Sequence, residues 1–450
     1  MARQNFDVTE GPLLKKTLLY AIPLILTSLL QLLFNAADLM VVGSVDEIYV
    51  GAVGSTGVVI NLIVNLFIGL SGGISVIVAQ NLGARDYVGT QKAVHTAIPL
   101  ALISGAFLTV AGFFYTRPML LWMGTPDEIL SLSEVYMKIY FCGMIPNLLY
   151  NFGAAILRAA GDTKSPLYYL VIAGVINVLL NLMFVNLFHM NVDGVALATI
   201  ISQCVSAVLV MNALLRRIDA IKFNFKEMKI DLESLKNIVK IGVPAGIQSS
   251  LYSIANIVIQ SSVNSFGPIS VTGNSAAGNI EGFAYVIMNS FYQSALTFTG
   301  QNIGAKKYKR INKVFGVNVL CTFVSGLLIG VFFTVFAEFF LSLYSVTDVE
   351  AVEFAKTRLF YVCFLYFLCG ILDVTTGVLR GIGSSFVPML ICIIGVCGLR
   401  LVWIFTVFAH HHTPETLFII YPISWLVTFA AEFIAYIVVR KRRQKLGLEA

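Results

Sequence analysis

The chain has 450 residues, of which 58% are hydrophobic and only 12% are charged, and its mean hydropathy is +0.84. A soluble protein carries roughly a quarter charged residues, so this composition excludes an ordinary soluble domain and indicates a membrane protein. The formal net charge of +6 does not indicate a nucleic-acid-binding protein, because the basic residues fall between apolar stretches rather than on one face.

Twelve apolar stretches are long enough to cross a bilayer as helices, which takes about 20 residues. In chain order they are residues 14–43, 50–80, 93–116, 135–157, 166–188, 194–215, 236–265, 272–300, 314–341, 354–379, 386–409 and 416–439. The first is expected to be a retained helix, since it is too long for the apolar segment of a signal peptide. The sequence therefore predicts an all-α polytopic membrane protein.

The basic residues predict which side of the membrane the loops face. Loops on the side of the two termini contain 25 of the 30 Lys and Arg residues. The opposite side has only Arg117, Lys138, Lys356 and Arg358, while Arg400 lies within a span. By the positive-inside rule, the basic side is cytoplasmic. We therefore expect a multi-pass protein of the cell membrane with both termini in the cytoplasm.

The two halves of the chain repeat each other. Residues 80–87, Gln-Asn-Leu-Gly-Ala-Arg-Asp-Tyr, return as residues 301–308, Gln-Asn-Ile-Gly-Ala-Lys-Lys-Tyr, 221 positions later. Pro23 and Pro244 are separated by the same interval. Each half holds six spans, so equivalent helices run in the same direction, as in parallel repeats related by an axis along the membrane normal.

The repeat predicts two pseudo-symmetric six-helix lobes. The predicted divisions are an amino-terminal lobe 13–217, a basic cytoplasmic linker 218–235, a carboxyl-terminal lobe 236–440 and a basic tail 441–450. Two similar bundles that rock against each other can give alternating access to a central site. Pro23 and Pro244 are hinge candidates, because proline removes a backbone donor and bends a helix. A static bend is the alternative.

Three polar residues of the first half are candidates for a cation-coupling site. Asp38 lies about five residues from the outer end of the first span, and Asn177 and Asn181 lie one turn apart in the outer half of the fifth. A charge at bilayer depth costs about 2.5–3.5 kcal/mol on insertion scales and so needs a reason. A carboxylate beside amide oxygens suits Na+ or a proton. The alternative is that Asp38 only accepts a hydrogen bond between packed helices.

In the second half, Glu281 and Arg400 are both predicted to lie about 14 Å below the outer surface. Opposite charges at one depth can form an ion pair that neutralises two costly groups. Both a structural ion pair and a charge facing a substrate cleft are compatible with the pattern. Asp373 lies nearer the cytoplasm and has no predicted partner.

Other chemistry is poorly supported. No phosphate-binding Gly-rich motif is present, which argues against ATP as the energy source, and no nucleophile–base arrangement indicates an enzyme. The seven cysteines lie inside apolar runs, and His410–His412 reads as a solvated outer loop, so no metal site is expected. Apart from a coupling ion, we expect no cofactor.

The motifs together resemble the multidrug and toxic compound extrusion (MATE) family of secondary transporters. The residues that carry the resemblance are the Asn35-Ala-Ala-Asp38 segment with Gly43, the loop with Gln80, Gly83 and Ala84, the loop 157–166 and the segment 194–203. The likeness extends over residues 13–440. It implies two six-helix lobes in a V shape and the export of organic cations or drugs, driven by inward Na+ or H+.

The resemblance also implies that the coupling cation binds in the amino-terminal lobe near Asp38. Many relatives have a second acid in the fifth helix, where this chain has Asn181, so the identity of the ion stays open between Na+ and H+. The expected function is a monomeric antiporter for small amphipathic cations embedded in membrane lipid, with no nucleic-acid partner. One alternative is a flippase of the same superfamily for a lipid-linked or amphipathic metabolite, although only Arg400 is available at depth for a pyrophosphate. A membrane enzyme is the other.

Overall fold

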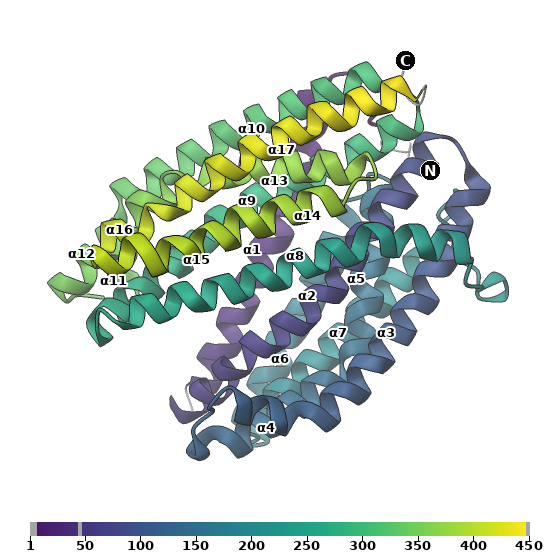
Figure 1. The fold of residues 1–450 in the computed structure, drawn as a ribbon. Coiled ribbons are helices and arrows are strands. Elements are labelled where there is room, and N and C mark those ends of the chain that lie inside the picture. The colour runs from purple at the N-terminus through teal and green to yellow at the C-terminus, as the bar shows by residue number, and fades with distance from the viewer. Residues whose placement is uncertain (1–6, 44–46, 345, 447–450) are drawn as a thin grey trace. The chain divides into compact units, whose positions relative to one another are not determined.

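The computed structural model describes residues 7–43, 47–344 and 346–446, and these contain helices and no strand (Figure 1). In the first half the helices are α1 (Leu13–Gly43), α2 (Glu47–Gly83), α3 (Tyr87–Trp122), α4 (Asp127–Cys142), α5 (Met144–Ala159), α6 (Lys164–Leu182) and α7 (Val192–Leu215). In the second half they are α8 (Leu232–Asn264), α9 (Pro268–Gly304), α10 (Tyr308–Val335), α11 (Ala337–Leu343), α12 (Val349–Arg358), α13 (Tyr366–Gly381), α14 (Phe386–Cys392), α15 (Leu399–Trp403), α16 (Pro414–Phe418) and α17 (Ile420–Lys445). Arg3 and the last four residues of the basic tail lie outside the described residues.

The all-α membrane fold is confirmed. Within the described part of the chain, nine helical stretches are long and apolar enough to span a membrane, and the bent pair of α4 and α5 makes a tenth. Helices α8 and α9 coincide with the seventh and eighth predicted spans but are not among these ten, since they contain more polar residues. Twelve spans therefore remains a prediction.

The fourth predicted span, residues 135–157, is not one straight helix. It consists of the second half of α4 and nearly all of α5, which meet at a 49° bend around Gly143. A side chain at Gly143 would lie 2.8 Å from Oε1 of Gln203 and 2.9 Å from Cγ1 of Ile200, so α7 packs closely against the bend. Short π-helical segments interrupt other spans, at Met183–Leu187, Leu359–Cys363, Ile393–Gly398 and Ile404–Phe408.

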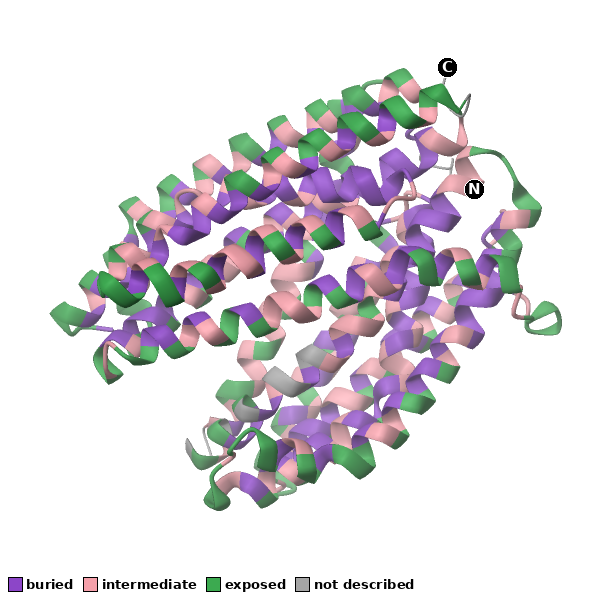
Figure 2. Ribbon diagram, in the orientation of Figure 1, coloured by how far each residue is buried: buried purple, intermediate pink, exposed green. Residues whose placement is uncertain are grey.

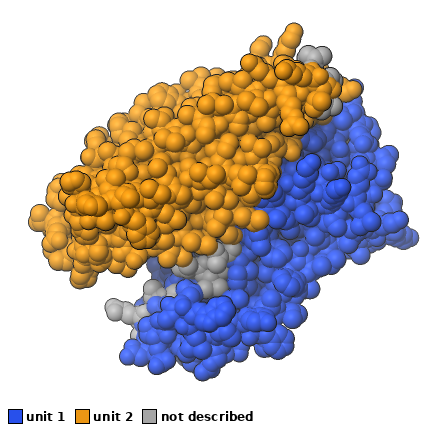
Figure 3. Space-filling view, in the orientation of Figure 1, with its two compact units in different colours: residues 1–6, 26–246 blue, residues 7–25, 247–450 orange. Residues whose placement is uncertain are grey.

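The chain forms two compact units (Figure 3). Unit 1 contains residues 26–246, and unit 2 contains residues 7–25 and 247–450. The contacts thus divide both α1 and α8 between the units, whereas the predicted lobes keep each of these helices whole. In unit 2, the first half of α1 is tied to α9 by a hydrogen bond of 2.9 Å between the hydroxyls of Tyr20 and Thr297.

Helices α2 and α8 approach each other closely in unit 1. The first part of α8 crosses α2 where Gly242 and Gly246 meet Gly69 and Gly73. A side chain added at Gly69 would lie 2.3 Å from the backbone nitrogen of Gly246, so only glycine permits this crossing. Small residues four apart on both helices are a common packing device within membranes.

Each unit has its own packed interior. In unit 1, α3 packs against α4 and α5, and α7 packs against α5 and α6. In unit 2, α9 packs against α10, α12 and α13, while α17 lies along α13 and α14. Buried residues line the sides where helices meet, and exposed residues, many of them large and apolar, cover the other sides (Figure 2). Exposed apolar faces of this kind are expected where lipid replaces water.

Candidate functional site

The predicted cation-coupling residues meet where α1 and α6 touch in unit 1. Asn181 is fully buried, and its side-chain amide donates hydrogen bonds to Oδ1 of Asp38 and, at 3.4 Å, to Oδ1 of Asn177. The structure therefore brings together all three residues that the sequence singled out. Their role in coupling stays a prediction.

The sequence builds this contact with one glycine and one aromatic residue. Gly174, Asn177 and Asn181 lie on one face of α6, because they are three and four residues apart. The ring of Phe34, one turn before Asp38 on α1, covers Gly174 so closely that an added Cβ would lie 1.8 Å from Cε2. Because Gly174 has no side chain, α1 can approach α6 at Phe34. Asp38, one turn beyond Phe34 on α1, then reaches Asn181 of α6.

The cluster offers oxygen atoms and no positive charge. Within the described chain, Asp38 forms no ion pair, and Oδ1 of Asn181 accepts no hydrogen bond although it is buried. Tyr136 and Tyr140 of α4 lie near enough to Asp38 to interact with its charge. Hard cations prefer such carboxylate and amide oxygens, and a proton could equally neutralise the carboxylate.

Unit 2 contains a carboxylate with the opposite surroundings. Glu281 of α9 accepts two hydrogen bonds from Arg358 at the end of α12, from Nη2 at 2.7 Å and from Nε at 3.1 Å. Nη1 of Arg358 also donates to Oδ1 of Asn274 at 2.5 Å. Both charged side chains are only 13% exposed. The carboxylate is neutralised by a two-bond arginine contact of the strong kind.

The predicted ion pair between Glu281 and Arg400 is therefore wrong. Arg400 is buried, but its Nε donates to the hydroxyl of Ser424 at 3.2 Å and its guanidinium lies 4.1 Å from the ring centroid of Tyr421. An aromatic face can stabilise a guanidinium that has lost water. The prediction failed because Arg358 was counted only among the basic residues of the outer side, whereas α12 packs on α9 and directs this long side chain to Glu281.

Sequence reasoning also missed a second buried carboxyl in unit 2. Glu432 of α17 is fully buried and accepts hydrogen bonds from the Thr376 hydroxyl at 2.9 and 3.0 Å and from Sγ of Cys392 at 3.1 Å. The signal was present, because Glu432 is an acid inside the last apolar stretch, as Asp38 is inside the first. Asp373, which had no predicted partner, forms no hydrogen bond or ion pair with any residue that the structure describes.

The two hinge candidates lie within continuous helices. Neither α1 nor α8 is interrupted at its proline, and Pro23 and Pro244 each lie close to the point where the helix passes from one unit to the other. Among the described residues, no three His, Cys, Asp or Glu side chains gather in a way that could hold a metal ion.

Long apolar helices in two units, a repeated sequence and buried polar side chains define a multi-pass membrane transporter. The MatE family model matches residues 23–183 and again residues 244–406, one match in each half. The chain therefore belongs to the MatE family.

Known proteins agree with this assignment along the whole chain. The probable multidrug resistance proteins YoeA and YpnP of Bacillus subtilis are 28% and 27% identical to it. The YoeA match covers 95% of this chain and 94% of that protein, and the YpnP match covers 88% of each. A solved structure of an outward-facing multidrug resistance MATE family transporter superposes with a TM-score of 0.90 at 21% identity, over 99% of both chains. The last likeness concerns the fold alone.

Proposed function

We propose that the protein is a secondary antiporter that exports amphipathic organic cations in exchange for inward-moving Na+ or H+. The names of YoeA and YpnP support multidrug export as the substrate class. The observation that carries the coupling is the Asp38 carboxylate, which lies within a membrane helix beside Asn181 and has no basic partner in the described chain. An acid in these surroundings can alternate between a cation-bound and an empty state.

The two hinge candidates fit alternating access. Helices α1 and α8 are shared between the units close to Pro23 and Pro244, so a bend at either proline would move one unit's part of the helix against the other part. Both prolines lie in a helix interior, where a backbone hydrogen bond is already missing. In this proposal, binding or release of the cation at Asp38 biases that bend.

The flippase alternative receives less support. A lipid-linked pyrophosphate would need several available basic side chains at membrane depth. Arg400 is bonded to Ser424 and stacked on Tyr421, and Arg358 is paired with Glu281. Export of small molecules asks for no such cluster.

Transport in proteoliposomes tests the function and identifies the ion. Purified protein would be reconstituted with a fluorescent organic cation, and Na+ and pH gradients would be imposed separately. We expect one gradient to drive accumulation of the dye against its own gradient. Accumulation under neither gradient, with protein that remains folded, would reject coupled export.

The proposed orientation, with both termini in the cytoplasm, can be tested by labelling. Lys226 lies exposed between α7 and α8, and Lys226→Cys should react only with a membrane-permeant probe in intact cells. His411→Cys, in the predicted outer loop, is the matched position that should react with an impermeant probe. Cys142 and Cys204 are exposed and would be replaced by Ser first. Impermeant labelling at position 226 would reverse the orientation.

A further inference from the structure

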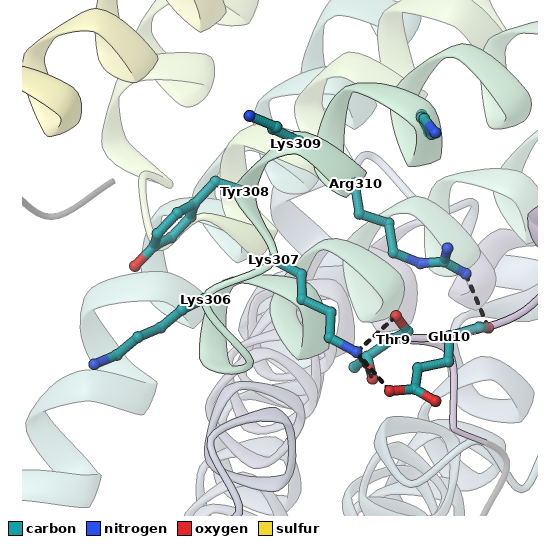
Figure 4. A pocket seen from close by; sticks show the side chains of 8 residues that line it. Thr9, Glu10, Lys306, Lys307, Tyr308, Lys309 and Arg310 are labelled. Atoms are coloured by element: carbon teal, nitrogen blue, oxygen red, sulfur yellow. Dashed lines mark hydrogen bonds and ion pairs between the residues drawn. The ribbon is translucent and has the colours of Figure 1, made fainter. Parts of the chain in front are cut away.

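The amino end of α10 carries a dense group of basic residues in unit 2. Lys306, Lys307, Lys309, Arg310 and Lys313 line an open cavity of about 540 Å³ together with Thr9, Glu10 and Tyr308 (Figure 4). Five cations and one acid give this cavity a strongly positive lining. Basic clusters next to the apolar part of a membrane helix attract the anionic headgroups of lipids.

The residues before α1 occupy only part of this group. Nζ of Lys307 donates to Oε1 of Glu10 at 2.9 Å and to the carbonyl and hydroxyl oxygens of Thr9, both at 3.2 Å. Arg310 donates through Nη2 to the carbonyl oxygens of Glu10 and Gly11, at 2.9 and 2.7 Å. Figure 4 shows both side chains directed at this segment. These two cations are therefore engaged.

Three cations remain without a partner. Lys306, Lys309 and Lys313 are exposed and form no hydrogen bond or ion pair with any described residue. In Figure 4, Lys306 and Lys309 point away from Thr9 and Glu10. A ligand that neutralises these lysines has to come from outside the described chain.

An exposed apolar face of α10 continues from these lysines. Spacing of three, four or seven residues places one set of side chains on one side of the helix, and all of them are exposed: Lys309, Lys313, Gly316, Leu320, Val324 and Val331. Nothing lies within 4 Å of where a side chain at Gly316 would be, so the face has an open notch one turn below Lys313. We call these six residues the α10 stripe.

We propose that the α10 stripe binds one anionic phospholipid of the membrane. The phosphate lies at Lys309 and Lys313, with Lys306 nearby, and the acyl chains follow Leu320, Val324 and Val331. The notch at Gly316 receives the glycerol and ester groups, which are bulkier than a single chain. Cations, notch and apolar face thus follow the order of the parts of a phospholipid.

The equivalent helix of the other half lacks this arrangement. At the interval of 221 residues, Lys309 corresponds to Val88, Lys313 to Lys92 and Gly316 to His95. Lys92 lies 3.6 Å from the carboxylate of Asp231, and Nε2 of the buried His95 accepts a hydrogen bond from the backbone of the linker. The linker therefore covers on α3 the surface that is open on α10.

In the linker contact, the carboxylate of Asp231 keeps its negative charge next to Lys92. The backbone N–H and the hydroxyl of Ser234 donate to Asp231 and lower the pKa of its carboxyl group, and Lys92 adds to the shift. Asp231 thus stays ionised beside Lys92 near neutral pH. We expect one such lipid site in each chain, on α10 and not on α3.

Native mass spectrometry of the protein in neutral detergent tests the proposal. Phosphatidylglycerol, phosphatidylcholine with the same acyl chains, and inorganic phosphate would be titrated separately. We expect one phosphatidylglycerol to bind more tightly than phosphatidylcholine, and inorganic phosphate not to compete. Lys309→Gln/Lys313→Gln should weaken the binding of phosphatidylglycerol by roughly 10- to 30-fold.

Two further variants test whether lipid binding depends on the α10 stripe itself or only on the net positive charge of the protein. Lys226→Gln/Lys229→Gln removes the same charge from the exposed linker and should leave the affinity unchanged. Gly316→Leu fills the notch, keeps every charge and should weaken binding of the lipid. The proposal would be overturned if Lys309→Gln/Lys313→Gln and Lys226→Gln/Lys229→Gln bound phosphatidylglycerol with equal affinity. Competition by inorganic phosphate would also overturn it, because the site would then take a free anion.

Discussion

Asp38 in unit 1 and Glu281 in unit 2 are both acids within helices of a membrane protein, but their neighbours differ. Asp38 accepts a hydrogen bond from the neutral amide of Asn181, and no basic side chain of the described chain lies at ion-pair distance. Glu281 is held by Arg358 through two hydrogen bonds. One carboxylate can therefore gain a cation from solution, and the other already has a permanent one.

The comparison shows that a polar residue in a membrane span is not by itself a functional site. Its partners decide whether the charge is available. In this account, unit 1 carries the coupling chemistry, and the Glu281–Arg358 pair stabilises unit 2. Each prediction below tests one side of that division.

The largest effect is expected at Asp38. Asp38→Asn keeps the size and polarity of the side chain and can still bond to Asn181, but it removes the charge that a cation would bind. Dye efflux from cells that contain equal amounts of protein should fall to the level of cells without the transporter. Efflux at the wild-type rate would show that Asp38 is a packing residue.

A large loss of stability is expected when the pair in unit 2 is broken. Glu281→Gln or Arg358→Met leaves one charge buried without a partner, which typically costs about 3–5 kcal/mol. The double variant should cost less than the sum of the two. Denaturation of the four proteins in detergent gives the coupling free energy. Additive effects would mean that the observed ion pair is energetically unimportant.

A smaller effect is expected at the contact between α1 and α6. Gly174→Ala forces the Phe34 ring away from α6, and overpacking of this kind costs about 1–3 kcal/mol. Because Asp38 lies one turn beyond Phe34, transport should also fall by several-fold. Gly72→Ala, at a position of α2 with nothing within 4 Å, is the matched control and should be nearly neutral.

Transport unchanged by Gly174→Ala would separate the glycine contact from the function of Asp38. The double variant Gly174→Ala/Phe34→Leu sharpens the test, because the smaller side chain leaves room for the added methyl group. Partial recovery of transport is expected.

The smallest effect is expected between Glu281 and Arg400. Their partners are separate, Arg358 for the acid and Ser424 with Tyr421 for the arginine. The losses in the free energy of unfolding caused by Glu281→Gln and Arg400→Met should therefore sum to the loss in the double variant, within about 0.5 kcal/mol. A coupling free energy well above that value would place the two side chains in one network.

Much of the architecture could be predicted because it depends on composition and spacing. Apolar stretches set the helices, and the repeat of residues 80–87 at 301–308 indicated two related halves. Asp38 and Asn181 could be proposed as neighbours because their depths match and the family resemblance places a cation near the first helix. The 49° bend around Gly143 was not predicted, because length and hydropathy do not distinguish one straight span from a bent pair of helices.

Partners of long side chains were harder to predict. Depth alone matched Glu281 with Arg400, but a guanidinium reaches several ångströms from its backbone, so Arg358 at the end of α12 was an equal candidate. Which helix faces which decides between them, and a single sequence does not contain that information. Glu432 was missed for a different reason, since its acid signal was present and its partners Thr376 and Cys392 have no distinctive pattern.

The most direct test compares the two acids in one reconstituted assay. Asp38→Asn and the double variant Glu281→Gln/Arg358→Met would be placed in proteoliposomes, and dye accumulation would be measured with and without the driving ion gradient. We predict that Asp38→Asn loses the response to the gradient, while the double variant keeps it. A gradient response that survives in Asp38→Asn and disappears in the folded double variant would contradict the account.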